Sequence, residues 1–117
     1  MFFTDMIKAV NGHLDKDQAL AYAADVKNDN FSAWTTMLPE GISASYARGK
    51  VAQRLITNPA LPDSEVNGLR PFADDPAVQN RTVIKNGQTQ QEAATDYMAA
   101  RKARVEYYKA KYGQAAS

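Results

Sequence analysis

Cysteine is absent from this 117-residue sequence, and histidine occurs once, as His13. The absence of cysteine excludes disulfides, thiol nucleophiles and thiolate metal sites. A single histidine excludes a zinc site with several imidazoles, and a Ser-His-Asp triad could use only this residue. Because His13 follows Gly12 in a stretch typical of a helix-ending turn, we interpret it as a solvated turn residue.

Motifs that dictate an enzyme reaction are missing as well. The sequence has no GxGxxG or GxxxxGK[ST] phosphate loop, no GxSxG nucleophile elbow and no calcium-loop pattern. The tight acidic pairs, Asp15/Asp17 and Asp74/Asp75, fit a helix cap and a turn, and Glu40 lacks a second carboxylate for glycoside cleavage. We therefore expect no enzymatic activity, no cofactor and no metal site.

Long apolar runs are also lacking. No window reaches the roughly 18 uninterrupted apolar residues that a membrane span requires. The first residues have no basic stretch before their apolar run, and Asp5 interrupts that run. We expect no membrane partner and no secretion by a signal peptide, with the protein either cytoplasmic or incorporated in a virion.

The net charge is +1, but it is distributed unevenly. Residues 1–40 carry a net −3, residues 41–60 a net +3 and residues 61–100 a net −3, by a count of Lys and Arg against Asp and Glu. Residues 101–117 hold five cations against the single acid Glu106, a net +4. Because proteins interact through local patches, this basic segment is a candidate contact surface.

The apolar spacing predicts an all-α fold in a single domain spanning 1–117. Residues 1–57 read as a helical core. Asp15 and Gln18 are predicted to form a capping pair for one helix. Ser43 is predicted to cap another, whose buried stripe is Ala44, Ala47, Val51 and Leu55.

Residues 58–87 are predicted to be an irregular connector, because they contain four of the five prolines and two of the six glycines. Asp75 with Pro76 could open one short helical turn. A hairpin about Asn86-Gly87 is an alternative, but its second strand would be entirely polar.

The last element is predicted to be a long C-terminal helix covering about 88–112. On a helical wheel, apolar and aromatic residues form a stripe between two rows of cations. The predicted partner-binding residues on and beside this stripe are Tyr97, Met98, Arg101, Val105, Tyr108 and Tyr112.

Three interpretations of this helix compete. In the first, it is a packed terminal helix whose late cations follow the helix dipole and extend into water. In the second, it is an assembly surface, because tyrosine and arginine are enriched at interface centres and exposed apolar stripes indicate partners. In the third, it is a nucleic-acid surface, in which cations neutralise phosphates and tyrosines stack on bases. The candidate nucleic-acid-binding residues are Arg101, Lys102, Arg104, Lys109 and Lys111.

Our hypothesis from the sequence is a non-enzymatic assembly or adaptor protein that contacts other proteins or copies of itself through the C-terminal helix and the connector. A minor structural component of a phage-like or virus-like particle is the setting we favour, although no motif supports it. A small nucleic-acid-binding protein is the alternative function. A small inhibitor of another enzyme is a further one, which sequence reasoning does not separate from an adaptor.

Overall fold

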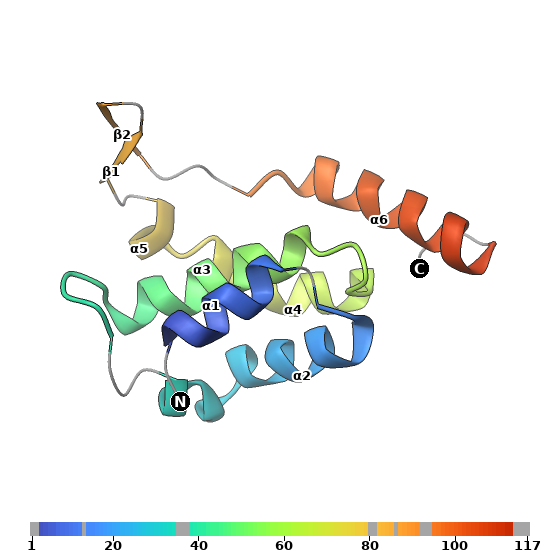
Figure 1. Cartoon of the computed structure of the whole chain (residues 1–117), viewed down its shortest axis with the longest axis horizontal. Helices are drawn as coiled ribbons and strands as arrows, with labels where there is room; N and C mark the ends of the chain where they lie inside the picture. The colour runs from blue at the N-terminus through green and yellow to red at the C-terminus, as the bar shows by residue number, and fades with distance from the viewer. Residues whose placement is uncertain are drawn as a thin grey trace.

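The computed structural model describes residues 3–12, 14–34, 38–79, 82–85, 87–91 and 95–113; His13 lies outside them. The elements follow one another in a mostly helical chain (Figure 1). They are α1 (Phe3–Asn11), α2 (Lys16–Lys27), the 3-10 helix η1 (Asp29–Trp34), α3 (Ala44–Thr57), α4 (Asp63–Ala73), α5 (Pro76–Gln79), β1 (Thr82–Lys85), β2 (Gln88–Gln91) and α6 (Tyr97–Tyr112). The predicted all-α class is confirmed, with one small hairpin added to the helices.

Helix α3 is the centre of the fold and packs against α1, α2, α4 and α5. In the view of Figure 1, α2 and α6 lie on opposite sides of it. Of its predicted stripe, Ala47, Val51 and Leu55 are fully buried, whereas Ala44 at the first turn is exposed. Burying the apolar faces of four helices against one central helix supplies the main favourable term for this fold. The other fully buried side chains of this core include Met6, Val10, Val26, Phe31, Ile56, Leu61 and Leu69.

Gly49 lets α3 approach its neighbours closely. A Cβ atom at this position would lie 2.2 Å from Val78 Cγ2 and 2.6 Å from the Phe72 carbonyl oxygen. Both distances are shorter than carbon contacts in proteins allow, so any side chain larger than hydrogen would push α4 and α5 away. A glycine in the middle of a helix, normally unfavourable, is here a packing requirement.

Two predicted helix caps are confirmed. The Asp15 carboxylate accepts a hydrogen bond from the Gln18 N–H at 3.0 Å, and the Ser43 hydroxyl oxygen accepts one from the Tyr46 N–H at 3.1 Å. Each side chain satisfies one of the N–H groups that the first turn of a helix leaves without a partner. The sequence therefore located the starts of α2 and α3 correctly.

The prediction that 58–87 is irregular is wrong. Helix α4 covers eleven residues of this segment, and α5 adds a short turn that begins at Pro76, as the Asp75-Pro76 pair predicted. Helix α4 was not predicted because it contains two helix-breaking residues, Gly68 and Pro71. Packing overrides them: Leu69 is fully buried, and the remaining apolar side chains of this face pack on the core.

The prediction that one helix covers 88–112 is also wrong at its start. Gln88–Gln91 forms β2, which pairs antiparallel with β1 in the register Val83↔Gln90 and Ile84↔Thr89. Gly87 in the turn has φ of 76°, a conformation that favours glycine. The hairpin considered as an alternative is thus present, and the C-terminal helix is limited to α6.

Candidate partner-binding helix

Helix α6 begins and ends at clear local signals. The Asp96 carboxylate accepts a hydrogen bond from the Ala99 N–H at 3.0 Å, and Gly113 ends the helix with φ of 72°. An acidic N-cap and a left-handed glycine after the last turn are the usual boundaries of a stable helix. The 16 residues between them give a helix of about 24 Å.

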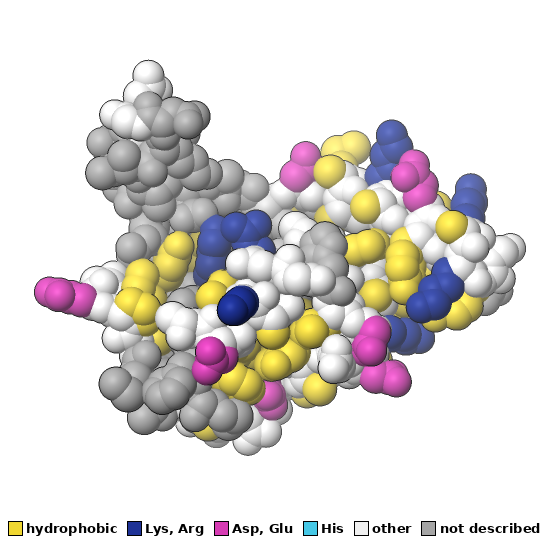
Figure 2. Space-filling model, viewed as in Figure 1, with side chains coloured by type: hydrophobic (Ala, Val, Ile, Leu, Met, Phe, Trp, Pro, Cys, Tyr) yellow, Lys and Arg dark blue, Asp and Glu magenta, His cyan; other side chains and the backbone are white. Residues whose placement is uncertain are grey.

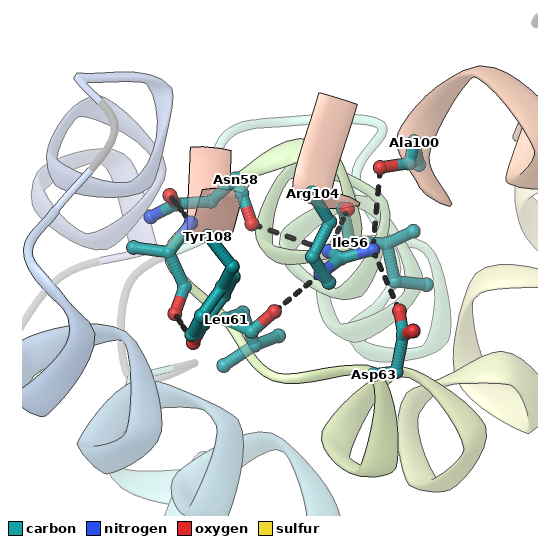
Figure 3. A network of polar contacts seen from close by, with 8 residues as sticks. Ile56, Asn58, Leu61, Asp63, Ala100, Arg104 and Tyr108 are labelled. Carbon is teal, nitrogen blue, oxygen red and sulfur yellow. Dashed lines mark hydrogen bonds and ion pairs between the residues drawn. The ribbon is translucent and has the colours of Figure 1, made fainter. Parts of the chain in front are cut away.

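Arg104 attaches the middle of α6 to the end of α3 (Figure 3). Its side chain is only 1% exposed. Its N–H groups donate to the carbonyl oxygens of Ile56 at 2.7 Å, Asn58 at 3.2 Å, Ala100 at 3.4 Å and Leu61. Ile56 lies in the last turn of α3 and Asn58 is its cap residue. Carbonyls at the end of a helix carry partial negative charge, so they are suitable acceptors for a guanidinium.

Asp63 supplies the opposite charge for this buried cation. Its Oδ1 atom lies 3.4 Å from Arg104 Nη1, and it occupies the first turn of α4, where the helix dipole favours an acid. Burial lowers the pKa of Arg104, and the Asp63 charge acts against that shift. A buried arginine is tolerated only when its donors and its charge both find partners, as they do here.

Two tyrosines complete the inner face of α6. The Tyr108 hydroxyl donates to the Ala60 carbonyl at 2.8 Å, and the Tyr97 hydroxyl donates to the Asp74 carboxylate at 2.7 Å. Burial, followed by the hydrogen bond to Asp74, raises the pKa of Tyr97 to about 12. Burial also raises the pKa of Tyr108. The inner face of α6 is therefore held largely by polar contacts.

The outer face of α6 presents apolar side chains to solvent. Met98 is 86% exposed, and Val105, two turns later on the same side, is half-buried. Lys and Arg side chains follow α6 with hydrophobic side chains between them on the face shown in Figure 2. A shallow groove of about 530 Å³ lies on this helix, lined by Met98, Arg101, Lys102, Val105, Glu106 and Lys109.

The structure divides the predicted partner-binding stripe between these two faces. Tyr97 and Tyr108 belong to the inner face and hydrogen-bond to the core. Met98, Arg101 and Val105 belong to the outer face and line the groove. Tyr112, in the last turn, is 47% exposed.

The predicted basic set divides too. Arg101, Lys102 and Lys109 are exposed on the outer face, and Lys111 is exposed near the end of the helix. Lys111 donates to the Tyr107 hydroxyl at 3.0 Å, and this bond raises the pKa of Lys111. Arg104 differs from the prediction of a solvated cation, because it is buried. The sequence prediction followed the apolar residues Met98 and Val105. The buried face lies about one position away from them, on the side of Arg104.

Among the described residues, no group of three or more His, Asp or Glu side chains is placed to hold a metal ion. None of the helices in the described part of the chain has the length and apolar character needed to cross a membrane. No protein-family model, curated protein or solved structure matches this chain.

Proposed function

We propose that this chain is a non-enzymatic assembly or adaptor protein whose α6 outer face binds a partner protein. The observation that carries the proposal is the exposure of Met98 within a basic groove on the surface. A large apolar side chain that is almost fully exposed loses free energy in water and gains it when a partner covers it. Val105 extends the apolar contact along the same groove.

Charge indicates the kind of partner. The groove is lined by Arg101, Lys102 and Lys109 against the single acid Glu106. Among the described residues none of the three cations has an ion pair, and so the groove favours an acidic partner. We propose a different protein that inserts an apolar segment flanked by aspartate or glutamate, the helix-in-groove mode of recognition. A phage-like or virus-like particle stays our proposed setting, on the sequence considerations alone.

A synthetic peptide tests this proposal directly. The probe is an amphipathic helical peptide with leucines on one face and glutamates beside them; the comparison peptide has glutamine in place of glutamate. Fluorescence anisotropy should show saturable binding of the acidic peptide and weaker binding of the neutral one. Sedimentation of the chain alone should show a monomer.

Matched variants locate the contact. Met98→Asp with Val105→Asp should abolish peptide binding, because both changes replace an apolar contact in the basic groove with a negative charge. Ala99→Asp with Ala103→Asp adds the same charge at two exposed positions of α6 outside the groove lining. This control variant should retain most of the peptide binding. The proposal fails if both pairs have equal effects or if neither peptide binds. If the chain dimerises as its concentration rises and the Met98→Asp/Val105→Asp variant does not, the partner is a second copy of this chain and not an acidic protein.

Nucleic acid is the alternative partner, supported by the exposed cations Arg101, Lys102, Lys109 and Lys111 together with the half-exposed ring of Tyr112. Binding to short single-stranded DNA should then weaken steeply with salt. It should be lost when Arg101, Lys102 and Lys109 are changed together to Glu. Binding that tolerates salt, or no binding, would exclude this function.

A further inference from the structure

A second hollow lies between α4 and α6, and it differs from the groove on the outer face. Its volume is about 260 Å³. Helix α4 contributes residues spaced by three or four positions, which share one face. Helix α6 contributes Tyr97 and Arg104 of its inner face, together with Arg101, which also lines the groove on the outer face. The lining residues are Asp63, Val66, Asn67, Arg70, Tyr97, Arg101 and Arg104.

The charges in this pocket do not cancel. Arg104 is paired with Asp63, and its N–H groups are engaged with that carboxylate and with backbone carbonyls. Arg70 and Arg101 are exposed and have no ion pair within the part of the chain that the structure describes. The pocket lining therefore carries two arginines, one from each helix, in addition to the Arg104–Asp63 pair.

Arg70 is oriented before any ligand arrives. Its guanidinium carbon lies 4.3 Å from the centroid of the Tyr97 ring. The ring is itself held by the hydrogen bond from its hydroxyl to Asp74. A guanidinium held over a fixed ring loses less entropy when a ligand binds it.

We propose that this pocket binds a small phosphate-bearing ligand between Arg70 and Arg101, with the Asn67 amide as an additional donor. Guanidinium groups match phosphate oxygens in geometry and charge. A tetrahedral phosphate can present separate oxygens to donors on two walls, whereas a planar carboxylate presents one edge. A phosphomonoester also carries the charge of about −2 near pH 7 that two cations balance.

The size of the pocket limits the ligand. A volume of about 260 Å³ lies just below the usual range for ligand pockets, which starts at about 300 Å³. A phosphate group with a few attached atoms fits this space, and a dinucleotide does not. We therefore assign the pocket to a small phosphomonoester.

Titration with inorganic phosphate and with glycerol phosphate tests the assignment. Amide chemical shifts, recorded at constant ionic strength, monitor the binding. Both ligands should bind saturably with one-to-one stoichiometry and shift amides of α4 and α6. Arg101→Gln and Arg70→Gln should each weaken binding by about tenfold. Lys102→Gln, the matched control, removes the same charge from the neighbouring position outside the pocket and should change the affinity less than about twofold.

Four outcomes would overturn the assignment. They are the absence of saturable binding, equal losses in Arg101→Gln and Lys102→Gln, acetate binding as tightly as phosphate, and a short DNA strand that occupies the pocket more tightly than glycerol phosphate. Thermal unfolding of Arg70→Gln checks that the loss of phosphate binding does not come from a loss of fold. Arg101→Gln tests the site independently. Met98→Ser should leave phosphate binding unchanged, so this proposal and the acidic-partner proposal succeed or fail separately.

Discussion

Arg104 Nη2 donates a hydrogen bond to the Ile56 carbonyl over 2.7 Å, and this contact joins the middle of α6 to the last turn of α3. The two residues are 48 positions apart in the chain. The contact explains why a helix with few buried apolar residues still lies against the core. It also orients α6, because the side that carries Arg104 must face α3, and Met98 is then left in solvent.

Removing the Arg104 guanidinium should be strongly destabilising. Arg104→Met would leave the carbonyls of Ile56 and Leu61 without their donor and Asp63 without its cation. We expect the free energy of unfolding to fall by about 3 kcal/mol or more, measured by urea denaturation. Arg101→Met, three residues away and exposed, should change it by no more than about 0.5 kcal/mol. Equal effects of the two substitutions would show that Arg104 does not hold α6.

Glycine-to-alanine substitutions should have opposite signs at two helical positions. Gly49→Ala should destabilise by about 2 kcal/mol, because the new methyl group meets Val78 and the Phe72 backbone. Gly68→Ala should stabilise by up to about 1 kcal/mol, because alanine is the better helix former and the nearest atom, at 3.0 Å, belongs to the flexible Lys27 side chain. Thermal unfolding of both variants checks this. A neutral or stabilising Gly49→Ala would mean that α3 is not in tight contact with α4 and α5.

Asn58 should be a stability determinant although it is polar. Its side chain is 2% exposed; the amide donates to the Leu14 carbonyl at 2.8 Å, and its oxygen accepts from the Ala60 N–H at 3.0 Å. Asn58→Ala leaves both partners unsatisfied, and we expect a loss of about 2 kcal/mol in urea unfolding. Thr57→Ala removes an exposed hydroxyl and serves as the neighbouring control, with a loss below about 0.5 kcal/mol. The interpretation is refuted if Asn58→Ala behaves like the control.

Stability should depend on pH in the alkaline range through Tyr97. The folded chain keeps the Tyr97 hydroxyl protonated up to its pKa of about 12, whereas the unfolded chain releases this proton near the ordinary value of 10.0. The stabilisation from this group is therefore complete below pH 10 and is lost as the pH rises toward 12.

Tyr97→Phe isolates this contribution. The variant should be less stable than the parent chain by about 1 kcal/mol near neutral pH, because the hydrogen bond to Asp74 is gone. The difference should shrink as the pH rises above 10, the value from which the unfolded chain begins to release the proton. Urea unfolding at a series of alkaline pH values measures it. A difference that stays constant or grows over this range would rule out the assigned role.

Local signals accounted for the first half of the molecule. Asp15 and Ser43 cap their helices through bonds to residues three positions later, so the sequence carries the whole interaction. In α3, apolar residues at helical spacing identified the buried side, with Ala44 in the first turn as the exception. The start of α6 had an equally local signal, Asp96 with Ala99, which the apolar pattern of the wheel obscured.

The second half depended on contacts between distant segments. Helix α4 contains a glycine and a proline, and it forms because Leu69 and Ala73 are buried against the core. The three- and four-residue spacing of Val66, Leu69 and Ala73 was the signal that could have revealed it. The hairpin depends on the turn at Gly87. Its second strand is entirely polar, so no apolar alternation in the sequence predicted it.

By itself, the sequence determined the helical class, the starts of α2 and α3 and the basic character of the C-terminal segment, because capping, apolar periodicity and charge are properties of neighbouring residues. Only the tertiary structure decided which side of α6 is buried. Hydropathy favours burying Met98 and Val105, and it places Arg104 in water. The carbonyls of Ile56, Asn58 and Leu61, at the end of α3 and just beyond it, reverse that choice. They offer acceptors to a guanidinium that no pattern within α6 reveals.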